Sequence, residues 1–234
     1  MGQYRAGRVK WLVLGVVLAV GFLSVPRALR ASPSQPEPRF SVAAPDFDPR
    51  IPLTVVVRGW LWDPESRKGT PPLVVFPSQV NDHLETRHGL STEIVQWDWS
   101  RLPADVFAAR KELGLYARSA GERAAEMGRC VNFVGHSAGA ALVYSVAADG
   151  NRMGYMGTLG LPTIGRGKPS SVTRWANFYT TTHSEDVAGR AWAARMGADV
   201  NVDLQMSHRD FWESDEAARI TADGIAASWN DCRA

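Results

Sequence analysis

The stretch that most constrains the fold is residues 130–148, CVNFVGHSAGAALVYSVAA. Residues 131–134 are apolar or carry a short amide, which is typical of a buried strand, and the small apolar residues from Ala140 onwards favour a helix. Only the segment GHSAG at 135–139 joins the two. The sequence therefore predicts a turn so sharp that Ser137 takes a strained backbone conformation, with its hydroxyl above the end of the strand.

The glycines on either side of this serine favour the same turn. Gly135 and Gly139 have no Cβ atom, so the strand and the helix can approach closely around Ser137. The start of the helix directs backbone N–H groups and the positive end of its dipole towards whatever is bound to the serine. These features predict that Ser137 acts as a nucleophile.

A G-x-S-x-G segment between a strand and a helix resembles the nucleophile elbow of the α/β-hydrolase superfamily, in its lipase and esterase branch. The resemblance spans residues 53–229 and implies an α/β fold, with a mostly parallel central sheet and helices on both faces. The loop at residues 162–171 is too short for a large lid domain, so we expect a minimal lid. The hydrolase domain is expected to cover residues 51–234.

The order of the predicted elements agrees with such a sheet. Apolar side chains recur at close to a 3.6-residue period over residues 103–127, which predicts a long helix with one buried face. A strand, a helix and a strand in sequence imply parallel strands with a right-handed crossover. Strands are predicted at 53–58, 93–97, 131–134, 153–161, 175–182 and 198–204, and further helices at 188–196 and 215–229, the last capped by Ser214. The apolar run 71–77 is open to interpretation as one more strand, followed by a polar loop at 81–88.

The resemblance implies a catalytic triad in the order serine, acid, histidine, and later residues of the chain fit it. Asp186 follows the predicted strand 175–182, where the family carries its acid, and Glu185 is the second candidate. His208 lies between the last predicted strand and the final helix, where the family carries its general base. His208 would take the proton of Ser137 during attack, and Asp186 would fix the imidazole tautomer.

The same chemistry needs two backbone donors for the oxyanion of the tetrahedral intermediate. One is predicted at the N–H of Ala138, directly after the serine, and the other at Trp60 or Leu61, in the loop after the first strand. Arg58 stands where the family often has histidine, so this loop departs from the family pattern. The departure leaves open a non-catalytic module that has the same fold and binds a ligand or a partner.

Other function classes find little support in the sequence. The formal net charge of +2 gives no sign of the basic surface that nucleic-acid-binding proteins carry. No G-x-x-x-x-G-K or H-E-x-x-H segment occurs, so neither a cofactor nor a metal ion is predicted. His83 and His88 match no metal-ligand spacing and are interpreted as part of a solvated loop.

The N-terminal residues 1–31 have the pattern of an export segment. Basic residues near the N-terminus precede residues 11–25, WLVLGVVLAVGFLSV, which are uncharged and almost wholly apolar. This run is shorter than the about 20 residues that a membrane-spanning helix usually needs. Residues 1–31 are therefore interpreted as a signal peptide, or as an uncleaved anchor that attaches the protein to a membrane through residues 11–25. In either case the protein is exported, and the proline-rich residues 32–50 predict an extended linker.

An exported protein can pair its cysteines, and this chain has 2. Cys130 opens the strand that leads to Ser137, so it lies at the opposite end of the sheet. Cys232 ends the last helix, which the resemblance places with its start near Ser137 and its end far from it. We therefore predict a disulfide between Cys130 and Cys232.

Together these observations predict an exported serine hydrolase, secreted or held in the periplasm or cell envelope. It would cleave lipid-like or small acyl esters through an acyl-enzyme on Ser137, Asp186 and His208. The expected partner is the ester substrate, and a monomer is expected. Acyl transfer to a sugar or lipid of the cell envelope uses the same triad and stays open, as does peptidase activity.

Overall fold

The computed structural model describes residues 48, 50–57, 72–97, 106–161, 167–181 and 197–232. The predicted export segment 1–31, nearly all of the linker 32–50 and the predicted helix 188–196 lie outside these residues. The division of the chain at residues 31 and 50 therefore stays a prediction. Within the described ranges, no helix is both long enough and apolar enough to span a membrane.

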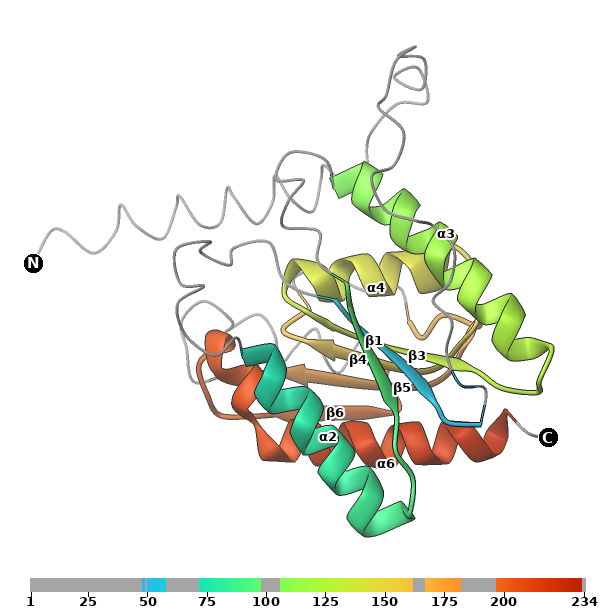
Figure 1. The fold of residues 1–234 in the computed structure, drawn as a ribbon. Helices are drawn as coiled ribbons and strands as arrows, with labels where there is room; N and C mark the ends of the chain where they lie inside the picture. The colour runs from blue at the N-terminus through green and yellow to red at the C-terminus, as the bar shows by residue number, and fades with distance from the viewer. Residues whose placement is uncertain are drawn as a thin grey trace, which may run out of the picture. The chain divides into compact units, whose positions relative to one another are not determined.

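Six strands form one sheet in the described part of the chain (Figure 1). Their order is β2-β1-β3-β4-β5-β6, and every pair of neighbours is parallel. The strands are β1 (Leu53–Val57), β2 (Glu93–Trp97), β3 (Val131–His136), β4 (Met153–Leu159), β5 (Val172–Tyr179) and β6 (Val200–Asp203). The predicted α/β fold with a mostly parallel central sheet is thus confirmed, and each strand overlaps a range predicted from the sequence.

The order of these strands explains where a binding site can form. The chain goes from β1 to β2 on one side and then crosses back, so that β3 lies on the other side of β1. In open parallel sheets, ligands bind outside the carboxyl ends of the strands, at the point where the strand order reverses in this way. We call the edge at which the parallel strands end the carboxyl edge, and the reversal leads us to expect a site there, beyond β1 and β3.

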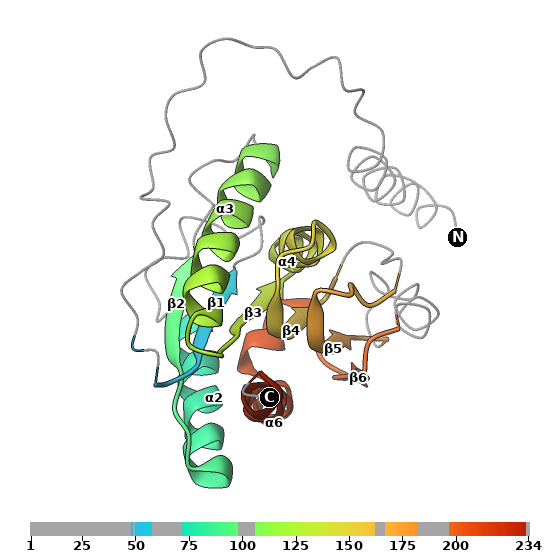
Figure 2. The ribbon, with the colours of Figure 1, turned by 90° about the vertical axis from the view of Figure 1, so that its right-hand side faces the viewer.

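Helices cover both faces of the sheet, as predicted (Figure 2). One face packs under α3 (Val106–Ala125) and α4 (Ala138–Ala148), and the other under α2 (Pro72–His88) and α6 (Asp215–Asp231). Successive side chains of a strand point to opposite faces, so Val55 belongs to the core under α3 and α4, while Val56 belongs to the other core. Because both faces are covered, every residue of β1 is buried.

The predicted helix 103–127 is confirmed as α3. Its buried face consists of residues three or four positions apart, Ala109, Leu113, Ala117, Ala120 and Ala124. Gly128 follows the helix with φ +63°, and this left-handed conformation lets the N–H of Arg129 reach the carbonyl of Ala124 at 2.8 Å. The helix therefore ends soon enough for β3 to begin at Val131.

Residues 72–88 form a helix, and the two predictions that fall on them are wrong. Within the predicted run 71–77, the described residues 72–77 are not a strand, and 81–88 is not a loop, because α2 covers Pro72–His88 and includes Pro77. Phe76, Val80 and Leu84 are four residues apart and buried at 1% exposure or less, so they form one apolar face against α6. Burial of this face offsets the backbone hydrogen bond that Pro77 cannot donate.

The final helix and its cap are as predicted, and α6 runs away from the carboxyl edge. Ser214 caps its start, where the side-chain oxygen accepts the N–H of Ala217 at 3.1 Å. Its end brings Cys232 to Cys130, and the predicted disulfide between them is present, with the Cα atoms 5.9 Å apart. Cys130 precedes β3 and Ser137 follows it, so the disulfide lies at the edge of the sheet opposite Ser137.

Candidate functional site

Ser137 has the strained backbone that the sequence predicts. Its φ is 53° and its ψ −123°, a region that residues with a Cβ atom seldom adopt. The conformation is held from both sides, because the Ser137 N–H donates to the carbonyl of Leu159 at 2.8 Å and the Ser137 carbonyl accepts the N–H of Ala140 at 3.0 Å. The residue sits between β3 and α4, at the carboxyl edge.

The close approach of strand and helix around Ser137 depends on Gly135. A Cβ atom at this position would lie 2.5 Å from the carbonyl oxygen of Gly139 and 2.7 Å from the Cα of Ala140. These are backbone atoms, so no rotamer change could relieve the contact. Any side chain at position 135 would push α4 away from β3, and Ser137 with it.

The structure brings His208 to the same edge as Ser137. His208 begins the short 3-10 helix η3 (His208–Glu213), which follows β6. Its ring lies against Gly160, where a Cβ atom would be 2.2 Å from Cε1 and 2.4 Å from Nδ1. Gly160 follows Leu159, whose carbonyl accepts the Ser137 N–H. The end of β4 therefore touches both the predicted nucleophile and the predicted base.

His136, the residue before Ser137, also contacts His208. The two rings have centroids 4.7 Å apart at an interplanar angle of 35°, and His136 Nε2 lies 2.8 Å from the His208 carbonyl oxygen. Burial and, to a smaller extent, the electrostatic influence of His208 lower the pKa of His136 to about 3, although the hydrogen bond to the His208 main chain acts in the opposite direction. His136 is therefore a neutral imidazole at physiological pH.

The strand ends that precede the predicted acid and the predicted base are joined to each other. The N–H of Thr181, after β5, donates to Asp203 Oδ1 at 3.2 Å, and the Thr181 hydroxyl donates to Asp203 Oδ2 at 2.5 Å. Asp203 ends β6 and also accepts the N–H of Gln205 at 3.3 Å. Sequence reasoning missed this contact and the role of Gly160, because neither belongs to a motif.

The other predicted site residues fall into two groups. Ala138 is the first residue of α4, where helix N–H groups have no partner within the helix. Asp186, Glu185, Trp60 and Leu61 lie outside the described residues, so their roles stay predictions.

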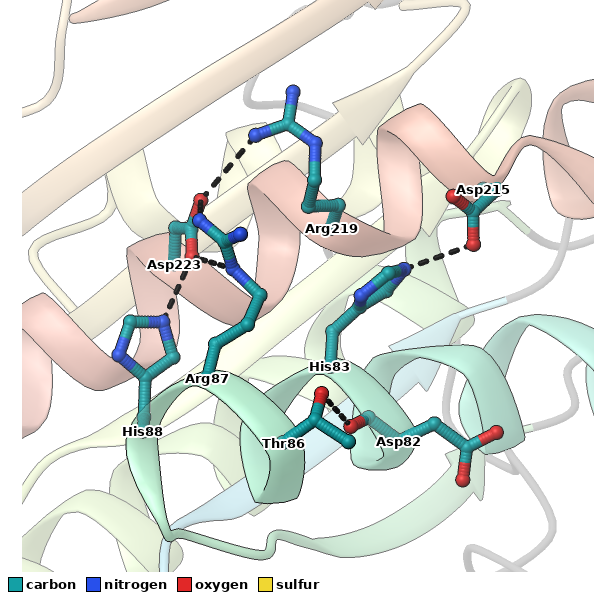
Figure 3. Close-up of polar contacts among 8 residues, drawn as sticks. All are labelled: Asp82, His83, Thr86, Arg87, His88, Asp215, Arg219 and Asp223. Carbon is teal, nitrogen blue, oxygen red and sulfur yellow. Dashed lines mark hydrogen bonds and ion pairs between the residues drawn. The ribbon is translucent and has the colours of Figure 1, made fainter.

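His83 and His88 lie on the surface of α2 that faces α6 (Figure 3). His83 Nε2 is 2.8 Å from Asp215 Oδ1, and His88 Nε2 is 2.7 Å from Asp223 Oδ1. Each histidine thus pairs with a carboxylate of α6 and is not part of a solvated loop. Among the described residues, no group of three His, Cys, Asp or Glu side chains could hold a metal ion.

No model of a known protein family matches the sequence, and no curated protein does. Among solved structures, the fold is similar to the crystal structure of a candidate hydrolase of the alpha/beta superfamily from Xanthomonas campestris pv. campestris. The two share 16% sequence identity with a TM-score of 0.52, and the match covers 75% of this chain and 98% of the other. Likeness at this identity concerns the fold alone. Together with the parallel sheet and its strand order, it shows that this chain has the α/β-hydrolase fold.

Proposed function

We propose that this protein is an exported serine hydrolase that cleaves carboxylic esters through an acyl-enzyme. Ser137 is the nucleophile, His208 the general base and Asp186 the acid that orients it. The observation that carries the proposal is the strained Ser137, at φ 53°, with the His208 ring packed at the same edge against Gly160. A polar side chain held in a strained turn beside a histidine is the arrangement that an activated serine requires.

The reaction proceeds in two halves. As the Ser137 oxygen bonds to the acyl carbon, its proton passes to His208, and the carbonyl oxygen of the ester becomes an oxyanion. The N–H of Ala138 and a backbone N–H of Trp60 or Leu61 donate to this oxyanion. When the bond to the alcohol breaks, His208 returns the proton to the departing alkoxide. Water then attacks the acyl-enzyme by the same route and releases the acid and Ser137.

The proposal of Asp186 as the acid rests on its place in the chain, between β5 and β6. The chain leaves β5 at Thr181, enters the segment that contains Asp186, and returns through β6 to His208. Asp203 joins Thr181 to the end of β6, so the two ends from which these loops depart keep a fixed separation. A fixed separation between these two strand ends favours a stable contact between acid and histidine.

The test is reaction with a fluorophosphonate probe, together with hydrolysis of 4-nitrophenyl esters. The wild type is expected to form a covalent adduct, and Ser137→Ala is expected to form none and to lose at least about 10³-fold in kcat. Ser91→Ala is the matched control, because Ser91 is exposed before β2, at the opposite edge. A folded wild type that neither reacts with the probe nor hydrolyses the esters would refute the proposal.

The substrate class is proposed as lipid-like or small acyl esters, because the chain offers little length for a large lid. A series of 4-nitrophenyl esters from acetate to palmitate orders acyl chains by kcat/KM. Adding an acceptor alcohol to the same assay separates hydrolysis from acyl transfer. A hydrolase yields mainly the free acid, whereas a transferase yields mainly the new ester.

A further inference from the structure

The reaction proposed above gives no role to His136, although this side chain is buried beside both reacting groups. It is 7% exposed and precedes Ser137 directly in the turn. A buried polar group is normally retained with a hydrogen-bond partner, and here that partner is the main chain of His208. The imidazole is therefore more than apolar filling, since leucine or phenylalanine would fill such a space at a lower desolvation cost.

The direction of the His136 bond is fixed by chemistry. The His208 carbonyl oxygen can only accept, so the bond of 2.8 Å requires a proton on His136 Nε2. Because His136 is neutral, its single ring proton is on Nε2 and Nδ1 carries none. One tautomer of one neutral ring is thus specified by its surroundings.

Aromatic contacts hold this ring on its other sides. His136 packs edge-on against Trp212, with centroids 5.4 Å apart, and against Phe211 at 6.2 Å. Trp212 in turn packs edge-on against Phe76 of α2 at 5.1 Å. The His136 ring is therefore fixed between the turn that carries Ser137 and the 3-10 helix that carries His208.

We propose that His136 is a positioning residue, which sets the place of the His208 imidazole relative to the Ser137 hydroxyl. This inference rests on the proposed function. His136 and Ser137 are consecutive, so a single hydrogen bond, from His136 to the His208 main chain, connects the neighbour of the nucleophile to the residue that carries the base. The His136 ring also lies against the His208 ring, and Gly160 bounds the His208 ring from β4. A displacement of about 1 Å at such a base can cost on the order of 100-fold in rate.

The neutral state of His136 suits this role. His208 becomes an imidazolium once it has taken the serine proton, and a second charged ring at a centroid distance of 4.7 Å would oppose that step. A neutral neighbour that donates to the His208 carbonyl keeps the base in place without this repulsion.

Two substitutions separate positioning from packing. His136→Phe keeps an aromatic ring between His208 and Trp212 but leaves the His208 carbonyl without its donor. His136→Gln loses the ring but places an amide N–H the same number of bonds from Cβ as Nε2. The rate constant for reaction with a fluorophosphonate probe, kcat and KM for 4-nitrophenyl butyrate, and the thermal unfolding midpoint are measured for each.

We expect His136→Phe to lower kcat and the rate of probe reaction by about 10- to 100-fold, with KM nearly unchanged. His136→Gln is expected to restore most of this loss, although its unfolding midpoint is lower than that of His136→Phe. His88→Phe on α2 is the control, since it removes a histidine that pairs with Asp223 of α6, and should react like the wild type.

The inference is overturned if His136→Phe reacts at the wild-type rate, or if the activity of the two variants follows their stability. If His136→Phe does not fold, the glutamine variant still decides, because it keeps a donor at this position: a folded His136→Gln that has lost 10-fold or more contradicts the proposal that this hydrogen bond positions His208. Failure of the proposed function looks different, because the wild type itself would then not react with the probe.

Discussion

At the scale of single residues, Gly160 gives the sharpest test of the site. Its φ of +63° and the His208 ring both exclude a Cβ atom, whereas Gly89 has nearly the same φ, +61°, and nothing within 4 Å of such an atom. Gly160→Ala and Gly89→Ala should therefore share a backbone cost of about 1 kcal/mol. Only Gly160→Ala should also displace His208 and slow the reaction of Ser137 with a fluorophosphonate probe. Equal probe rates in the two variants would show that the His208 ring has no part in activating the serine.

His136 makes stability depend on pH in a predictable direction. Its pKa falls from 6.5 to about 3 on folding, mainly through burial, so the unfolded chain binds a proton that the folded chain does not. The contribution is fully present above about pH 6.5, and the free energy of unfolding should fall as the pH is lowered from there towards 3. The measurement is urea unfolding of the wild type and of His136→Gln across this range. The difference between them should shrink with acid, and a difference independent of pH would contradict the burial of a neutral ring.

At the scale of elements, the sequence pattern predicted most of the helices and strands. Short apolar runs marked the six strands, and a 3.6-residue period marked α3. A capping residue, Ser214, marked the start of α6. The sequence did not predict α2, because its prolines resemble the residues that bound a short strand. Its buried apolar face is narrow and includes Phe76, Val80 and Leu84. The serine and the histidine could be predicted, since a motif and a chain order mark them. The Gly160 and Asp203 contacts could not, because they join loops that meet only when the sheet has formed.

The packing of α2 on α6 gives a prediction at the same scale. Leu84 is fully buried between the helices, whereas Asp223, at 32% exposure, bonds Arg87 and His88 at the surface (Figure 3). Leu84→Ala should cost about 2 to 5 kcal/mol of unfolding free energy, and Asp223→Asn about 1 kcal/mol or less. Urea unfolding at low and high salt separates the two, because only the Asp223 effect should weaken with salt. The reverse order of costs would mean that ion pairs, and not apolar contacts, hold these helices together.

At the scale of the whole molecule, the disulfide ties the end of the last helix to the start of the central strand. Cys130 and Cys232 are 102 positions apart, and in the chain-entropy model a cross-link of this span stabilises by about 4 to 5 kcal/mol. Such bonds are typical of oxidising compartments, which favours the proposal that the protein is exported. The double variant with serine at both positions should melt at a lower temperature and lose its response to reductant. It should keep its probe reactivity when folded, because the bond lies at the edge opposite Ser137; a folded variant without reactivity would contradict that separation.

The proposed pairing of Ser137 with His208 is tested by mapping the fluorophosphonate adduct by mass spectrometry and timing its formation in the wild type, His208→Ala and His88→Ala. We expect an adduct on Ser137, formed at equal rates in the wild type and His88→Ala and at least about 100-fold more slowly in His208→Ala. An adduct on another residue, or a folded His208→Ala that reacts as fast as the wild type, would contradict it.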